Sequence, residues 1–440
     1  MVLTIVQSLC FVLFVGGCSY IAFRGFRNVY LNIMLGRAAD YTDHPGERWK
    51  TMLMVALGQK KMFKRPIAAM LHLVIYVSFV ITQVELIEIF IDGIFGTHRF
   101  LFHAWENIPF LRGLYVFAIN LIEVLSVLTF IVTIAFLYRR DLLKLPRFNK
   151  PEMKGWPDMD AHIILFLEMF LITNIFIMNS FDMAAAHGEY GFWISGMIAH
   201  SWEGMNESLL EIFEKIGWWG HLAGVLGFLM YLAHSKHLHI LLAFPNTYFS
   251  RLTPKGYINN MPEVTREVKL MLDPNAQVEP AASDAPAKFG AKDIFDLTWK
   301  NLLDAYTCTE CGRCTAQCPA NMTGKLLSPR KIMMDTRDRM EEVREKMDAN
   351  KGVWVDDGKN LIENGYISVE ELRACTTCNA CVEECPVNIS PLDIIMQLRR
   401  SLIMEDSNSP NEWNGMFANL ENNGAPWQFS PQDRLNWEKA

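Results

Sequence analysis

The 440-residue chain lacks an excess of positive charge: its formal net charge is −7. Binding to nucleic acid requires a basic surface that displaces phosphate counterions, so we exclude DNA and RNA as partners. Residues 246–440 also lack any apolar run near the roughly 20 residues that a membrane-spanning helix needs. We therefore expect this part of the chain to be soluble.

Cysteines are scarce outside one short region. Eight of the ten lie between Cys308 and Cys385, and the other two, Cys10 and Cys18, belong to an apolar stretch where we interpret them as helix residues. This crowding excludes the dispersed disulfide framework of a secreted domain. It is typical of metal thiolates in a reducing compartment.

Long apolar runs are present only in the first half of the chain. Five segments are long enough to span a bilayer, at residues 3–23, 67–91, 113–138, 161–181 and 218–243. The first has no Lys or Arg before Arg24, which disfavours the alternative of a cleaved signal peptide. The sequence therefore predicts a five-helix membrane domain over residues 1–245.

Basic residues are unevenly distributed among the loops. Nine Lys and Arg residues follow the first span between Arg24 and Arg65, and six follow the third span between Arg139 and Lys154. By the positive-inside rule both loops face the cytoplasm. Five crossings then place the N-terminus outside and the soluble half inside, so we predict a multi-pass inner (plasma) membrane protein.

The cysteines form two copies of the run CxxCxxCxxxCP, which end at Pro319 and Pro386. In such runs three closely spaced thiolates bind one [4Fe–4S] cluster and the fourth binds the other cluster. The pattern predicts one cluster on Cys308, Cys311, Cys314 and Cys385, and a second on Cys375, Cys378, Cys381 and Cys318. A pair of zinc sites is the competing interpretation, which two complete four-cysteine runs disfavour.

Helix signals surround both runs. A Ser-Pro pair follows each of them, with Ser328 and Ser390 as expected N-caps and the prolines as first helical residues. A helix is predicted over residues 329–349, and a capping box from Ser368 to Glu371 leads into the second run. The cluster region is therefore expected to be α-helical.

This helical two-cluster pattern resembles the ferredoxin domains of heterodisulfide reductase (its C-type component), anaerobic glycerol-3-phosphate dehydrogenase and succinate dehydrogenase. The resemblance covers residues 293–402. Residues 246–292 before it are expected to be an amphipathic stretch and a Pro/Ala-rich linker, extended over 273–292. Residues 403–440 after it form an aromatic tail, which we expect to dock on a partner protein or on this domain.

Two histidines, His221 and His239, are 18 residues apart in the last predicted span. In a continuous helix this is five turns and about 27 Å, which puts both side chains on one face and turns His234 and His237 away from it. The motifs His221-Leu-Ala-Gly-Val-Leu-Gly and Leu238-His239-Ile240 resemble the last helix of the nitrate reductase gamma subunit, a quinone-linked cytochrome b.

That resemblance implies a haem b held by His239 and by His72 of the second span. The family has a second histidine ten residues after the first, but here the position is Thr82. His221 is therefore a further candidate haem ligand without an evident partner. A loop histidine, His187 or His200, could supply that partner, or His221 could help to bind quinone.

Four carboxylates, Glu85, Glu88, Glu123 and Glu168, fall within or at the ends of spans. Buried carboxylates in a membrane are costly and mark proton paths or ligand sites. Glu85 and Glu88 lie near Thr82, so we consider them candidates for a proton or quinone site. Protonated carboxyls bonded to neighbouring helices are the alternative.

Taken together, the sequence predicts an all-α protein: a five-helix, cytochrome b-like bundle followed by a helical dicluster ferredoxin. Related fusions continue into cysteine-rich CCG domains, but no cysteine follows Cys385. We expect the cytoplasmic redox partner to be a CCG-domain protein, an electron-transfer flavoprotein or a dehydrogenase. The predicted function is electron relay to membrane quinone, and the alternative is a non-catalytic assembly or redox-sensing subunit.

Overall fold

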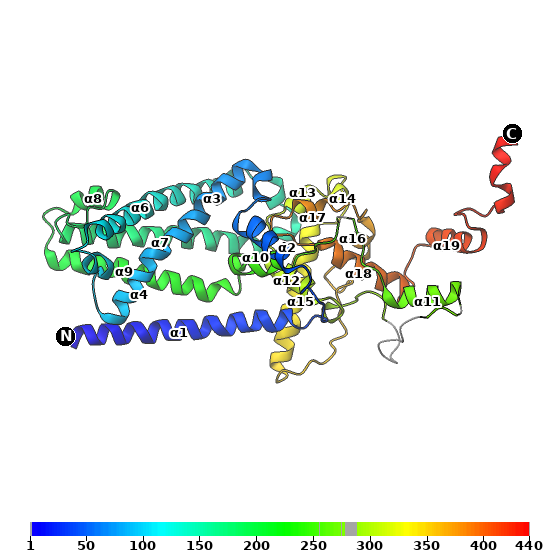
Figure 1. The fold of residues 1–440 in the computed structure, drawn as a ribbon, viewed down its shortest axis with the longest axis horizontal. Coiled ribbons are helices and arrows are strands. Elements are labelled where there is room, and N and C mark those ends of the chain that lie inside the picture. Colours follow the sequence, from blue (N-terminus) through cyan, green and yellow to red (C-terminus); the bar gives the residue numbers. More distant parts are fainter. Residues whose placement is uncertain (1, 255, 274, 278–287, 440) are drawn as a thin grey trace.

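The structure is a computed structural model that describes residues 2–254, 256–273, 275–277 and 288–439. Within these residues it is helical and has no strand, only two isolated bridges, Arg37 with Thr298 and Ile362 with Ile367. The predicted all-α class is confirmed. The molecule is elongated, with a bundle of long helices at one end, a compact helical region in the middle and the C-terminal tail at the other end (Figure 1).

The bundle consists of long apolar helices joined by short loops. They are α1 (Val2–Ile33), α3 (Pro66–Ile81), α4 (Gln83–Phe95), α6 (Pro109–Leu137), α7 (Trp156–Ala185) and α9 (Glu207–Leu232). Among the described residues, four helices are long and apolar enough to cross a membrane: Ile5–Ile33, Pro66–Phe95, Pro109–Leu142 and Trp156–Ala185. Large apolar side chains such as Ile21, Phe117 and Ile131 remain exposed on the bundle, as expected for a lipid-facing surface.

The fifth predicted span differs from expectation. Instead of one helix over residues 218–243, α9 ends at Leu232 and α10 (His239–Tyr248) begins after a short 3₁₀ turn, η7 (Lys236–Leu238). The two parts meet at an angle of 91°. Helices α9 and α10 count as a fifth span only if both are taken together. Because His221 lies on α9 and His239 on α10, the prediction that they share one helix face is wrong.

Asp160 of α7 stabilises this break. Its Oδ1 accepts hydrogen bonds from the hydroxyls of Tyr231 and Ser235, and its Oδ2 accepts one from the backbone N–H of Lys236. Asp160 is 2 % exposed. The break is therefore held by a buried carboxylate on a neighbouring helix, because a freed backbone donor needs a partner wherever water is excluded.

Short elements connect the long helices. At the end of the bundle next to the compact region these are α2 (Pro45–Met52), η1 (Leu53–Leu57), η2 (Met62–Lys64), η3 (Tyr138–Leu142), η4 (Pro146–Phe148) and η5 (Pro151–Met153). At the far end they are α5 (Phe100–Ala104), α8 (Ile194–Ala199) and η6 (His200–Trp202). The loops expected to be basic thus lie at the end that carries the compact region.

The compact region contains both cysteine runs. Its elements are η8 (Ile294–Asp296), α12 (Trp299–Thr307), α13 (Arg313–Ala316), α14 (Pro319–Met322), α15 (Pro329–Ala349), α16 (Val369–Ala374), α17 (Ala380–Glu384) and α18 (Pro391–Met404). The helix predicted over residues 329–349 is α15, and the Ser368–Glu371 capping box is formed. Ser328 caps α15 as predicted, whereas Ser390 precedes α18 without a side-chain capping bond.

Two segments flank this region. Helix α11 (Pro262–Leu272) lies in the predicted amphipathic stretch, while most of the predicted extended linker over residues 273–292 lies outside the described residues. The tail forms α19 (Asn411–Asn423) and η9 (Pro431–Lys439), which project away from the compact region in Figure 1. Its aromatic side chains are exposed, including Phe429 and Trp437.

Candidate metal centre and its contacts with the membrane helices

The two cysteine runs adopt the same local backbone path. In the first run Glu310 and Gly312 have positive φ angles of 55° and 70°. The equivalent residues of the second run, Thr377 and Asn379, have φ angles of 57° and 61°. Positive φ angles are rare in residues other than glycine. Their occurrence at equivalent positions of both runs indicates that the backbone turns several cysteines of each run toward one point.

Each run borders a cavity that also receives a cysteine from the other run. The first cavity is lined by Cys308, Cys311, Cys314, Cys381 and Cys385. The second is lined by Cys318, Cys375, Cys378 and Cys381. The structure thus brings the predicted ligands of each cluster to one cavity, and Cys381 lines both cavities.

Backbone amides support the cysteine sulfurs. The N–H of Thr377 donates to the Sγ of Cys375 over 3.4 Å, and the N–H of Ile389 donates to the Sγ of Cys385 over 3.3 Å. Hydrogen bonds of this kind stabilise thiolate charge. The cysteines of the first cavity are buried or half-buried, whereas Cys378 of the second is exposed.

Arginines lie close to the first cavity. Arg313 and Arg330 line it, and a Cβ built on Gly312 would lie 3.3 Å from the Cβ of Arg147. Burial, with the nearby charges of Arg65 and Arg313 adding to it, lowers the pKa of Arg147 to about 10, so this side chain stays charged at neutral pH. These guanidinium groups suit a centre with a net negative charge, such as an iron–sulfur cluster with four thiolates.

The compact region and the near ends of the membrane helices share one hydrophobic core. Val29 and Ile33 of α1 and Leu238 of η7 belong to the same buried cluster as Leu302 and Tyr306 of α12. The backbone of Arg37 also pairs with residues on either side of Thr298. The cysteine-lined cavities are therefore held in a fixed position against the bundle.

Polar contacts reinforce this docking. Fully buried Arg330 pairs with Glu152 over 2.8 Å, and Lys236 of the helix break pairs with Glu310 of the first run over 2.7 Å. Lys64 pairs with Glu383 at the surface. The first basic loop thus contacts an acidic residue of the second cysteine run, and the helix break contacts one of the first run.

Three histidines meet where the bundle contacts the compact region. The rings of His72 on α3 and His239 on α10 have centroids 6.4 Å apart at an interplanar angle of 44°. His237 stacks on His239 at 5.3 Å and 7°. The expectation that His237 points away from His239 is therefore wrong, because the break between α9 and α10 changes the direction of the chain.

The ring nitrogens of His72 and His239 have distinct surroundings. The Nδ1 of His239 lies 3.1 Å from the carbonyl oxygen of Lys236, and the Nδ1 of His72 lies 3.3 Å from the Oε1 of Gln59. If both Nδ1 atoms carry the proton, each Nε2 keeps a free lone pair, as a metal-bound histidine requires. The Nδ1 of His237 is buried without a partner among the described residues.

His221 is separate from this group. It lies on α9, is 7 % exposed, and its Nδ1 donates to the carbonyl oxygen of Leu171 over 3.1 Å. His200 pairs instead with Glu203 on an exposed loop. Within the residues that the structure describes, we find no ring contact between His221 and another histidine.

A buried polar cluster occupies the far end of the bundle. Arg99, 4 % exposed, pairs with Asp182 over 2.8 Å and lies 3.5 Å from Glu85 and 3.6 Å from Glu88. Arg99 and Asp182 were not predicted from the sequence. The available signal for Arg99 was its position in a loop with few basic residues between two apolar spans.

The glutamates of this cluster differ in their bonding. Glu88 accepts from the hydroxyl of Tyr115 and from the backbone N–H of Leu101, so both its oxygens are satisfied. Glu85 accepts through Oε1 from Asn179 and Arg99, but its Oε2 is buried without a partner in the described part of the chain. Glu88 thus fits the alternative of a carboxyl bonded to neighbouring helices, while Glu85 retains one oxygen that accepts no hydrogen bond in the described structure.

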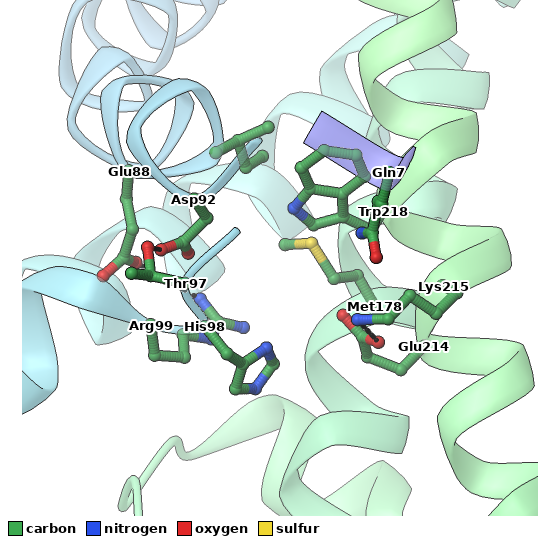
Figure 2. Close-up of a pocket in the computed structure, with 11 residues that line it drawn as sticks. Gln7, Glu88, Asp92, Thr97, His98, Arg99, Met178, Glu214, Lys215 and Trp218 are labelled. Atoms are coloured by element: carbon green, nitrogen blue, oxygen red, sulfur yellow. Dashed lines mark hydrogen bonds and ion pairs between the residues drawn. The ribbon is translucent and has the colours of Figure 1, made fainter. Parts of the chain in front are cut away.

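A small cavity opens beside this cluster (Figure 2). Its lining side chains come from the α4 region, including Glu88, His98 and Arg99, and from α9, including Glu214 and Trp218. In Figure 2 these two groups face each other across the opening, with Met178 between them. Eight of its eleven lining residues are polar or charged, and Ile89, Met178 and Trp218 supply the apolar part of the wall.

The other two intramembrane carboxylates are placed differently. Glu123, fully buried on α6, accepts from the backbone N–H groups of Ile194 and Ser195 at the start of α8. It therefore satisfies free helix-terminal donors, a structural role. Glu168 lies within the α7 span and shows no hydrogen bond or ion pair among the contacts of the described residues.

Comparison with known proteins identifies the cysteine-rich region. The 4Fe–4S dicluster domain family matches residues 307–389. A probable iron-sulfur-binding oxidoreductase FadF of Bacillus subtilis is 26% identical over 92% of this chain and 57% of its own length. EtfAB:quinone oxidoreductase of Syntrophomonas wolfei is 24% identical over 90% of this chain and 54% of its own length.

Other relatives match a smaller share of the chain. A probable membrane-anchored ferredoxin of Chromohalobacter salexigens is 36% identical over 35% of this chain and 25% of its own length. The C and D components of heterodisulfide reductases from Methanosarcina species match about a quarter to a third of the chain. No solved structure matches. The chain spans about half the length of the Bacillus and Syntrophomonas relatives.

These matches confirm the resemblance to heterodisulfide reductase and the iron–sulfur prediction. The chain thus contains a 4Fe–4S dicluster region, joined to helices of membrane type, and is similar to iron–sulfur oxidoreductases, a membrane-anchored ferredoxin and heterodisulfide reductase subunits.

Proposed function

We propose that this protein relays electrons between a cytoplasmic redox partner and membrane quinone, through two [4Fe–4S] clusters and one haem b. The observation that carries the proposal is the continuous arrangement of two cysteine-lined cavities and a histidine pair at one end of the bundle. Electron transfer needs carriers in fixed positions, and the shared core supplies this rigidity.

We assign cluster 1 to Cys308, Cys311, Cys314 and Cys385, and cluster 2 to Cys375, Cys378, Cys381 and Cys318. The grouping of these side chains around two separate cavities supports the assignment. Cluster 1 is then the one beside the membrane helices, because Arg313 at its cavity donates to the carbonyl oxygen of Met62 in the loop before α3.

We assign His72 and His239 as the residues that would hold the haem. Two imidazoles on opposite sides of one metal ion, each with a nitrogen about 2 Å from the metal, have centroids about 6 Å apart. The observed 6.4 Å fits this geometry. A haem b bound there would supply a one-electron carrier between the ferredoxin region and the bundle.

A second haem is not part of the proposal. Thr82, at the position where the family has its second histidine, lies at the junction of α3 and α4, and its hydroxyl donates to the carbonyl oxygen of Phe79. His221 contacts α7 instead of another histidine in the described structure. We therefore keep His221 as a bonded interior residue of the α7–α9 contact.

We place the quinone at the cavity in the far end of the bundle, with Glu85 as the candidate proton-transfer group beside it. Reduction of a quinone takes up two protons with two electrons, so a buried carboxyl with an unused oxygen is suited to the task. Of the residues that line this cavity, Arg99 lies 3.5 Å from Glu85, and Glu88 has both of its oxygens already bonded.

The redox partner is proposed to approach cluster 2. Cys378 is exposed, which brings this centre close to the molecular surface. The name of the Syntrophomonas relative specifies EtfAB and quinone as its partners, which supports an electron-transfer flavoprotein; a CCG-domain protein or a dehydrogenase fits the same surface. The basic loops lie at this end of the bundle, which supports its cytoplasmic placement.

Metal and haem analysis tests the proposal. The purified full-length protein should contain about eight iron atoms in clusters with acid-labile sulfide, one haem b, and no stoichiometric zinc. Quinone should oxidise the reduced protein. Clusters without haem and without any response to quinone would instead favour an assembly or redox-sensing subunit, and zinc in place of iron would favour a scaffold.

A further inference from the structure

Gln59 stands out as a buried polar residue in an unusual backbone conformation. It follows η1 and Gly58 in the loop that leads to α3, is 5 % exposed and has a φ of 50°. A non-glycine residue in the left-handed region is held there only when its surroundings require it. The side chain explains the requirement, since its Oε1 lies 3.3 Å from the Nδ1 of His72.

The same loop also contacts the ferredoxin region. Lys61 donates to the carbonyl oxygen of Val382 and to the Oδ1 of Asn388, beside the end of the second cysteine run. Met62 accepts from Arg313 of the first run. A stretch of four residues, from Gln59 to Met62, thus contacts His72, the first cavity and the second run.

A hydrogen bond at Nδ1 decides what the rest of a histidine ring can do. If Nδ1 donates to Gln59, the Nε2 of His72 is the unprotonated nitrogen, and the ring cannot rotate freely. An acceptor at Nδ1 also increases the electron donation from Nε2 to a bound metal. On the other ring the backbone carbonyl of Lys236 plays this part, so Gln59 is the side-chain partner that substitution can alter.

We propose that Gln59 is a positioning residue, which fixes the tautomer and orientation of His72 and sets the midpoint potential of the haem that His72 binds. The inference rests on the haem assigned above. Gln59 would not touch the haem iron, and its hydrogen bond to His72 would lower the midpoint potential.

Two substitutions of similar size separate the possibilities. Gln59→Glu provides a stronger, charged acceptor, stabilises the ferric haem and lowers the midpoint potential; a tenfold change in the ferric preference corresponds to 59 mV. Gln59→Met removes the acceptor, raises the potential and weakens haem retention, by about 10–100-fold for loss of such a partner. The expected order of potentials is Glu, wild type, Met, from lowest to highest.

The measurement is an anaerobic optical redox titration of the haem in the full-length protein, with haem content determined in parallel. Gln83→Met is the matched control, since the side chain of Gln83 donates to the carbonyl oxygen of Phe79, four residues earlier along the same span. The haem of this control variant should have the same midpoint potential as that of wild type. Absence of haem b from wild type would overturn the proposed function itself. If haem is present and its midpoint potential is the same in wild type and in Gln59→Glu, only the inference about Gln59 is overturned. The Gln59→Glu variant is sufficient for this test if Gln59→Met fails to fold.

Discussion

The buried pair between Arg330 and Glu152 provides a direct test of how the ferredoxin region is held on the membrane helices. Arg330 has no exposed surface and donates to Glu152 over 2.8 Å and to the carbonyl oxygen of Arg147 over 2.6 Å. Glu152 also accepts from the hydroxyl of Ser328, the N-cap of α15. Glu152→Ala would leave a buried guanidinium without its counter-charge.

The expected cost follows from that burial. Removing one partner of a buried ion pair costs about 3–5 kcal/mol, because the remaining charge stays desolvated. This corresponds to a loss of at least ~100-fold in the equilibrium between folded and unfolded ferredoxin region. Glu152→Gln keeps the shape and an acceptor, so its effect should be smaller.

The assay is urea-induced loss of the visible iron–sulfur absorbance of the full-length protein in detergent, compared as unfolding midpoints. The control is Lys64→Ala, which removes the half-exposed pair with Glu383 in the same interface. Such pairs contribute only about 0–1 kcal/mol. Equal midpoints for Glu152→Ala and Lys64→Ala would refute the reasoning that burial makes the first pair dominant.

The same pair has a defined pH dependence. Burial would raise the pKa of Glu152, but its hydrogen bonds with Ser328 and Arg330 outweigh burial and lower it below the usual 4.5. A carboxyl with a lowered folded-state pKa stabilises the fold above its unfolded pKa and loses that contribution as the pH falls through the folded value. The midpoint difference between wild type and Glu152→Gln should thus be constant from pH 8 to about pH 5 and shrink only below ~4.5.

Three further predictions address the carriers. Alanine at His72 or His239 should abolish the haem b spectrum, whereas alanine at His237, stacked on His239, should retain it; loss in all three variants would contradict the ligand assignment. Arg313→Gln removes a positive charge at the first cavity and therefore disfavours the more negative reduced state of the cluster there. An EPR-monitored redox titration should show the midpoint potential of one cluster lowered by about 59 mV or more, which is a tenfold effect, and that of the other unchanged. Glu85→Gln should slow quinone-dependent oxidation of the reduced protein by about 100-fold, the usual range for a lost proton-transfer group, with spectra unchanged; a wild-type rate would exclude Glu85 from proton transfer.

Local signals in the sequence predicted the ferredoxin region well. The Ser-Pro pair at Ser328 defines the start of α15, and the capping box at Ser368 forms as expected. Each of these features depends on residues within one helical turn. The Ser-Pro pair at Ser390 shows the limit, since the helix begins there without the side-chain bond.

Features that depend on distant residues could not be predicted in this way. The apolar pattern continues through the break between α9 and α10, and the group that stabilises the break, Asp160, lies more than 70 residues earlier on α7. The stacking of His237 on His239 follows from that break. The pairing of Arg99 with Asp182 likewise joins two loop-proximal positions that no local periodicity connects.

If electrons pass between the clusters and quinone by way of the haem, rapid mixing of the fully reduced protein with a soluble quinone analogue should reveal the order in which the carriers are oxidised. We predict that the haem is oxidised first and both clusters follow, and that His239→Ala leaves both clusters reduced. Clusters that are oxidised by quinone at the wild-type rate in His239→Ala, or that never respond to quinone in wild type, would contradict the account.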